Sequence, residues 1–193
     1  KRVDPHFAMF WEKQIPKVKN TDINGNMTEV TVVAGKYRSS SAPTPPPNSW
    51  AANQENDLAV WVIKMGKGAK WSLPAVSETS GRSLYVVKGK GVEIDGQPIP
   101  EKSRVEILTP GAFNIVSAGN EVELLLLQGR PIAEPVAQYG PFVMNTEAEI
   151  REAYDDYSRT RFGGWKWSEN DPVHGKNPEK FAQLIDGSVD KPV

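Results

Sequence analysis

Hydrophobic residues occur in short runs through the middle of the chain, and turn-forming residues separate the runs. This pattern predicts β-strands at 57–65, 83–88, 91–94, 104–108, 113–117 and 121–128. After 91–94, Asp95-Gly96 is a strong signal for a two-residue hairpin turn into a short strand at 97–99. Short strands with turn signals at fairly even intervals predict an all-β sandwich or a jelly-roll barrel.

Two further apolar segments precede this body. Residues 6–15 and 27–34 are both predicted to be strands. Strand alternation places three apolar residues of the second segment on one face: Val30, Val32 and Ala34. Val33 is apolar on the other face, so we expect this strand to be buried on both faces near its end.

A polar and proline-rich segment at 36–56 separates these strands from the body, and we expect it to be a loop. Its triple proline at 45–47 predicts a stiff polyproline II stretch. We interpret that stretch as a fixed spacer rather than as a ligand for a proline-recognition domain.

One helix is predicted after the body, over residues 146–161. Thr146 and Glu149 have the spacing of a capping box, in which each side chain accepts a hydrogen bond from the other residue's backbone amide. An apolar stripe follows at helical spacing: Ile150, Ala153, Tyr154 and Tyr157. The pair at 163–164 is Gly-Gly, which is expected to end the helix. In the polar tail a short helix is expected at 178–185, with these anchors: Phe181, Leu184 and Ile185.

Composition narrows the class of protein. The 193 residues suit one domain with extensions, and the 16 Pro and 16 Gly favour a turn-rich β fold. A net charge of −1 gives no general attraction to nucleic acid or to anionic lipid, and no apolar run approaches membrane-spanning length. The absence of Cys excludes disulfides and thiol catalysis. No signal peptide is visible, and we expect a cytoplasmic location.

The run Gly-Pro-Phe-Val-Met-Asn-Thr at 140–146 is long and unusual enough to be a signature. It resembles the C-terminal region of the pirin family, whose members are two-domain cupin proteins. The resemblance is strongest at 124–145 and through the helix to Trp167, and it covers nearly the whole chain. It implies a cupin jelly-roll β-barrel with a C-terminal α-helix and an extended tail.

The two sequence elements that form a cupin metal site are present without their metal ligands. The stretch 65–74, followed by 83–89, resembles the first element, in which a Gly-rich turn precedes His-x-His, a Glu and an apolar strand. The His positions are occupied by Trp71 and Leu73, or by Ser72 and Pro74 if the register moves by one residue. Glu78 is a candidate remnant of the acidic ligand.

The second element, at 109–120, resembles the cupin Pro-Gly-Asp run that precedes a third His. Here Ala112 replaces the acidic residue, and no His follows. The whole chain contains two His, at His6 and His174, so a centre of three His and one Glu cannot be built. We therefore expect no metal, no cofactor and no catalytic residue in this chain. Trp71 and Leu73 are expected to fill the barrel interior, which we favour over an apolar ligand pocket.

The resemblance implies three parts: residues 1–56 as linker, leading strands and Pro-rich loop, 57–130 as the C-terminal cupin barrel, and 131–193 as crossover, helix and tail. In pirins the N-terminal barrel holds one metal, usually iron. Some members resemble quercetin 2,3-dioxygenases, and others are described as co-regulators that bind protein partners. Both readings stay open for the parent protein, so whether it is an enzyme is undecided.

The first residues resemble the run that joins the two barrels in pirins: Lys1-Arg2-Val3-Asp4-Pro5. We therefore expect Lys1 to be a cut or the edge of an ordered region, which we favour over a naturally processed N-terminus. The expected partner is the N-terminal cupin domain of the same protein, with self-association as the other way to cover an exposed apolar surface. Neither nucleic acid nor membrane is expected as a partner.

Overall fold

The structure is a computed structural model and describes residues 3, 6–108, 110–164, 179–184 and 186–192. The chain divides into two compact units. One is formed mainly by residues 5–131 and the other mainly by residues 132–191. No helix in these described ranges is both long enough and apolar enough to cross a membrane.

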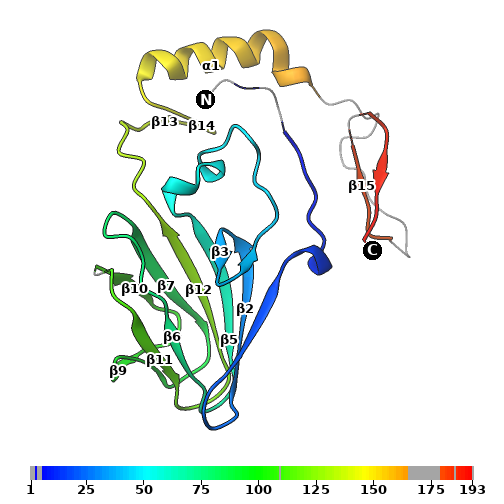
Figure 1. The fold of residues 1–193 in the computed structure, drawn as a ribbon. Helices are drawn as coiled ribbons and strands as arrows, with labels where there is room; N and C mark the ends of the chain where they lie inside the picture. The colour runs from blue at the N-terminus through cyan, green and yellow to red at the C-terminus, as the bar shows by residue number, and fades with distance from the viewer. Residues whose placement is uncertain (1–2, 4–5, 109, 165–178, 185, 193) are drawn as a thin grey trace. The chain divides into compact units, whose positions relative to one another are not determined.

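The larger unit is built from two antiparallel sheets (Figure 1). The six-stranded sheet has the spatial order β1 (Lys17–Thr21), β2 (Met27–Ala34), β5 (Ala59–Met65), β12 (Val122–Gly129), β7 (Gly81–Lys88) and β10 (Arg104–Ile107). The four-stranded sheet has the order β6 (Lys70–Leu73), β11 (Phe113–Ser117), β8 (Val92–Ile94) and β9 (Gln97–Ile99). Shorter elements lie between β2 and β5: β3 (Lys36–Tyr37), β4 (Ser40–Ser41), η2 (Trp50–Ala52) and η3 (Gln54–Asn56).

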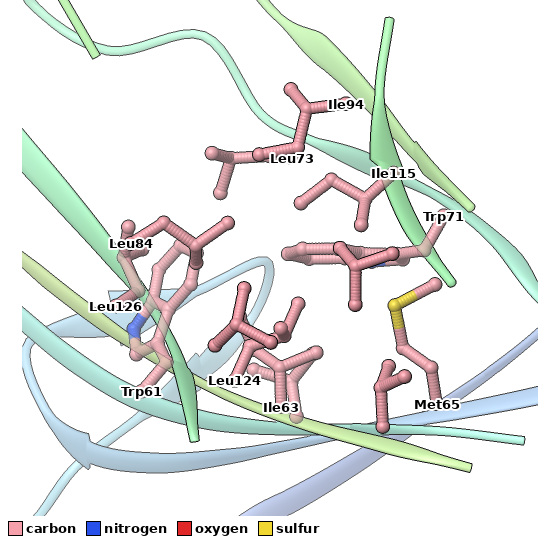
Figure 2. Close-up of a cluster of buried hydrophobic side chains, with 14 of the residues drawn as sticks. Trp61, Ile63, Met65, Trp71, Leu73, Leu84, Ile94, Ile115, Leu124 and Leu126 are labelled. Carbon is pink, nitrogen blue, oxygen red and sulfur yellow. The ribbon is translucent and has the colours of Figure 1, made fainter. Parts of the chain in front are cut away.

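Alternation along the strands places one apolar face of each sheet in a shared core (Figure 2). The six-stranded sheet contributes the buried residues Val30, Val32, Trp61, Ile63, Met65, Leu84, Val86, Leu124 and Leu126. The four-stranded sheet contributes Trp71, Leu73, Val92, Ile94 and Ile115. The structure confirms the all-β jelly-roll fold, which the strand pattern allows and which the family resemblance implies.

Several local predictions are also confirmed. β2 has the predicted bounds, and the strands of the body lie within a few residues of their predicted positions. Asp95 and Gly96 both have positive φ, of 46° and 78°, and they join β8 to β9 as the hairpin signal predicts.

Other predictions are wrong. Residues 6–15 form no strand but lead into the 3₁₀ turn η1 (Glu12–Gln14), and the strand follows at β1. The reason is local. The Trp11 amide donates a hydrogen bond to the side-chain oxygen of Gln14, and the Gln14 amide donates to the carbonyl oxygen of Trp11. A turn uses the groups that a strand would offer to its neighbour. Val33 is 41% exposed, so β2 is buried on one face.

The barrel sheet also starts earlier than residue 57, where we expected it to begin. β2 pairs with β5 along most of its length, and β1 pairs with β2. The leading strands of 1–56 are therefore part of the same sheet as the body. The segment 36–56 is not wholly a loop, since it contains the β3–β4 hairpin, η2 and η3.

The turn between β1 and β2 is tied to the opposite sheet by one carboxylate. Asp22 Oδ1 accepts the amide hydrogens of Asn24 and Asn26 at 2.9 Å, and Oδ2 accepts that of Lys70 in β6 at 3.0 Å. Burial acts to raise the pKa of Asp22, but these donors outweigh it and hold the pKa below its ordinary value of 3.8.

A carboxyl group with a depressed pKa in the folded state stabilises the fold above its unfolded pKa. That stability is lost as the pH falls through the lower, folded pKa. We expect the free energy of unfolding to decrease as the pH is taken below about 4. Asp22→Asn should have a flatter pH dependence there, measured by denaturant unfolding at a series of pH values. Identical pH profiles for the two proteins would show that Asp22 is not the responsible group.

The smaller unit contains a short hairpin and the one α-helix of the described residues. Its elements are β13 (Ala137–Tyr139), β14 (Phe142–Met144), α1 (Glu147–Thr160), η4 (Arg161–Gly163), β15 (Ala182–Gln183) and β16 (Val189–Asp190). The capping box is confirmed: Thr146 Oγ1 accepts from the Glu149 amide at 3.2 Å, and Glu149 Oε2 accepts from the Thr146 amide at 2.9 Å. α1 packs on the hairpin, where the Phe142 and Tyr154 rings meet edge to face at 4.8 Å.

Three details of this unit differ from expectation. The apolar stripe is narrower, because Ile150 and Ala153 are buried while Tyr157 is 47% exposed. The helix ends at Arg161 in a left-handed conformation with φ of 48°, ahead of the glycine pair. The prediction of a short helix at 178–185 is wrong for the residues that the structure describes, because Ala182 and Gln183 form β15, which pairs with β16. Ile185 lies outside the described residues.

We expect Thr146→Ala to destabilise α1 by roughly 1 kcal/mol, because the substitution removes the acceptor for the Glu149 amide. Amide hydrogen exchange of the first helical turn is the appropriate measurement, since it reports local opening. Thr146→Ser keeps the hydroxyl and serves as the control. Equal protection in the alanine and serine variants would contradict the role of the cap.

Candidate functional site

Trp71 and Leu73, which we expect to stand at the His positions of the first cupin element, lie side by side on the inner face of β6. Trp71 is 6% exposed and Leu73 is fully buried, and both belong to the central core (Figure 2). The indole Nε1 of Trp71 donates to the Tyr37 hydroxyl at 3.0 Å, and that hydroxyl donates to Asn20 Oδ1 at 3.1 Å. The structure thus places both side chains inside the barrel, as the filled-interior interpretation predicts.

Aromatic rings close this part of the interior. Tyr37 meets Trp61 edge to face with ring centroids 5.0 Å apart, and its ring is 6.1 Å from that of Trp71. Tyr37 and Trp61 are themselves 2% and 4% exposed. The indole nitrogen of Trp carries a hydrogen and has no lone pair to offer a metal. In Trp71 that hydrogen is already donated to the Tyr37 hydroxyl.

The remaining candidate ligands are not brought together. Ser72, Pro74, Glu78 and Ala112 are exposed at the ends or edges of strands and in loops, and His6 is exposed ahead of η1; His174 lies outside the described residues. Among the described residues, no group of three His, Cys, Asp or Glu side chains has the arrangement of a metal site. The donors of the described residues therefore do not fit a metal held by three His and one Glu.

A buried cation at one end of the barrel was missed by the sequence reasoning. Arg82, in β7, is 2% exposed, and its guanidinium donates to the carbonyl oxygens of Pro74 at 2.6 Å and Gly111 at 2.8 Å. It also lies 5.5 Å from the centre of the Phe113 ring. The signal was present, since Arg82 alternates in phase with the inward-facing Leu84 and Val86.

Asp57 provides the compensating charge at this end. Its Oδ2 accepts from Ser80 Oγ at 2.7 Å and its Oδ1 accepts from Gln128 Nε2 at 3.1 Å, which ties together the ends of β5, β7 and β12. Burial lowers the pKa of the Arg82 guanidinium, and the nearby Asp57 carboxylate acts in the opposite direction. These residues form a polar layer between the apolar core and the end of the barrel.

A cleft of about 550 Å³ opens above this layer, where β5 begins and β12 ends. Its walls combine aromatic, aliphatic and charged side chains: Tyr37, Trp61, Pro74, Val76, Lys36, Arg38, Glu55 and Asp57. Figure 1 shows the β3 hairpin beside this end of the sheet. The volume lies in the range of small-molecule sites, which is about 300–1,000 Å³.

Comparison with known proteins gives consistent matches. A sequence profile described as "Pirin C-terminal cupin domain" matches residues 60–163. A Pseudomonas aeruginosa protein named "Putative quercetin 2,3-dioxygenase" is 32% identical over 161 residues, which cover 82% of this chain and 51% of the relative. A tomato protein named "Pirin-like protein" is 30% identical over 169 residues, covering 84% of this chain and 52% of the relative.

Solved structures agree with the sequence matches. A crystal structure titled quercetin 2,3-dioxygenase, from Acinetobacter baumannii, superposes with a TM-score of 0.62 at 31% identity. The superposition covers 78% of this chain and 48% of that one. The chain thus spans about half the length of the first relatives and solved structures it matches.

Proposed function

Because this chain belongs to the pirin family, we propose that it is the C-terminal, non-metal-binding cupin half of a two-barrel protein that resembles an iron-dependent quercetin 2,3-dioxygenase. The observation that carries the proposal is the burial of Trp71 and Leu73 at the two cupin ligand positions. Neither side chain has a lone-pair donor for a metal, and both fill the interior of the barrel.

The proposed partner is an N-terminal cupin barrel of the same protein, which would hold the metal. Two observations support it. Relatives named as quercetin 2,3-dioxygenases or pirin-like proteins are about twice as long as the aligned region. The smaller unit also presents large apolar side chains to solvent, with Val136 75%, Tyr139 70% and Val143 55% exposed. Large exposed apolar side chains on or next to neighbouring strands support a protein interface.

The alternative function is a regulatory module that binds protein partners without catalysis. The same exposed side chains of the smaller unit favour it, because a partner protein or a second copy of the chain would cover them equally well. In both cases we place the protein in the cytoplasm, which agrees with its lack of cysteine.

The two functions are separated by studying the protein as it occurs in its own cells. We expect affinity capture with an antibody against this chain to recover a polypeptide of about twice its mass, with one metal per polypeptide and O₂-dependent consumption of quercetin. A metal-containing polypeptide that consumes no quercetin and copurifies with a stoichiometric partner would favour the regulatory module. Recovery of only a 21.3 kDa chain would overturn the two-barrel proposal.

A further inference from the structure

The cleft at the end of the barrel has features that the non-metal-binding role does not explain. Its lining includes an aliphatic wall, formed by Pro74 and Val76, and the edges of two core rings, Tyr37 and Trp61, which are 2% and 4% exposed. Trp61 Nε1 is a buried donor with no hydrogen-bond partner among the residues that the structure describes. Apolar walls in a cleft of this size are typical of sites for small organic molecules.

The rim of the cleft carries two cations. Lys36 and Arg38 both line it, and neither forms an ion pair with another described residue. The Arg38 guanidinium lies over the Tyr37 ring, 5.4 Å from its centre. This stacking holds the cation at the rim of the cleft.

Arg38 occupies an unfavourable backbone position. It is one of the two residues that connect β3 to β4, and its φ is 53°. Two-residue hairpin turns of this kind favour Gly, Asn or Asp at positions of positive φ, because a side chain is strained there. The turn therefore holds Arg38 at the rim of the cleft at some cost in backbone strain.

The acidic residues of the cleft do not cancel this positive charge. The carboxylate of Asp57 is already engaged by Ser80 and Gln128, and it faces the charge of the buried Arg82. Glu55 is the remaining carboxylate in the lining, against the two cations Lys36 and Arg38. The charge available to a ligand is therefore positive, and it lies in the same cleft as the aliphatic wall.

We propose that this cleft binds a small aromatic carboxylate, with the ring against Pro74 and Val76 and the carboxylate on Arg38. Arginine is the side chain best suited to bind a carboxylate, because its planar donors match the two oxygens. The inference concerns the cleft alone and does not depend on the two-barrel function.

Three isosteric probes test the charge and the ring separately: benzoate, neutral benzamide and cationic benzamidine. We expect benzoate to bind the 193-residue chain with a Kd on the order of 1 mM, as suits so small a ligand. The indole N–H signal of Trp61, assigned with Trp61→Phe, should shift saturably in an NMR titration. Benzamide should bind more weakly than benzoate, and benzamidine should bind weakest.

Two substitutions at the rim have opposite expected effects. Arg38→Gln should weaken benzoate binding about tenfold, because it removes a charge-assisted hydrogen bond. Glu55→Gln should strengthen it about threefold by removing a nearby like charge. Arg104→Gln removes the same charge on β10, away from the cleft, and should leave the Kd unchanged. Circular dichroism melting checks that each variant is folded.

The proposal is overturned by any of three results. These are the absence of a saturable shift with benzoate, an unchanged Kd in folded Arg38→Gln, or tighter binding of benzamidine than of benzoate. A weakening by Arg104→Gln equal to that by Arg38→Gln would also overturn it, because binding would then follow the net charge of the protein.

Discussion

Replacing Trp71 with alanine is expected to lower the free energy of unfolding by about 3–5 kcal/mol, which is the usual cost of removing a buried Trp. The side chain is 6% exposed within the core between the two sheets. Its loss would leave a cavity and would remove the hydrogen bond that Nε1 donates to the Tyr37 hydroxyl. That hydroxyl would lose a partner in a buried place, which adds to the cost.

Denaturant unfolding measures this effect, and two controls separate its parts. Trp71→Phe keeps most of the volume but not the donor, so its cost should be clearly smaller than that of alanine. Lys70→Ala alters the exposed neighbour on the same strand and should change stability by about 0.5 kcal/mol or less. If Trp71→Ala costs less than about 1 kcal/mol, the interior is not filled as described.

Gly35→Ala is expected to be the most damaging small substitution, at about 3 kcal/mol or more. Gly35 has a φ of 78°, and a Cβ there would overlap the carbonyl oxygen of Leu58. The backbone must therefore move at the point where β2 leads into β3, which carries Tyr37. Both the strained φ and the steric overlap oppose the alanine.

Gly25→Ala is the matched control, because Gly25 has a similar φ of 83° but open space around its Cβ position. It should cost only the left-handed strain, about 1–2 kcal/mol. Thermal or denaturant unfolding of the two variants gives the comparison. Equal costs would show that the close approach of Leu58 contributes nothing and that only the φ angle matters.

The sequence allowed most of the fold to be predicted wherever a local pattern determined the structure. Alternation located β5, β7, β11 and β12, the Asp95-Gly96 pair located a hairpin, and the Thr146 and Glu149 spacing located the start of α1. These signals act within a few residues, and burial of a single face enforces them.

Prediction was wrong where distant partners or short hydrogen bonds determined the structure. The aromatic segment before Lys17 reads as a strand but turns at Trp11 and Gln14. β6 has only four residues, and its pairing with β11, about forty positions later, makes it a strand. Propensity alone is weak evidence for strands of this kind.

The candidate sites likewise include one feature that the sequence predicted and one that it did not. The absence of His was visible in the sequence in either register, at Trp71 and Leu73 or at Ser72 and Pro74. The structure shows that Trp71 and Leu73 are the pair that faces inward. The cleft was not visible, since it combines Lys36 and Arg38 from a hairpin with Glu55 from a 3₁₀ turn and Val76 from a loop. Only the folded arrangement brings these residues to one end of the barrel.

The most direct test of the central claim is the metal content of the purified, untagged 193-residue chain. The protein is produced in medium supplemented with iron, nickel, zinc and manganese, and the metal-to-protein ratio is measured by elemental analysis after gel filtration. The account predicts a ratio close to zero for every metal, because the two cupin ligand positions hold buried Trp71 and Leu73. One tightly held metal ion per chain would contradict it.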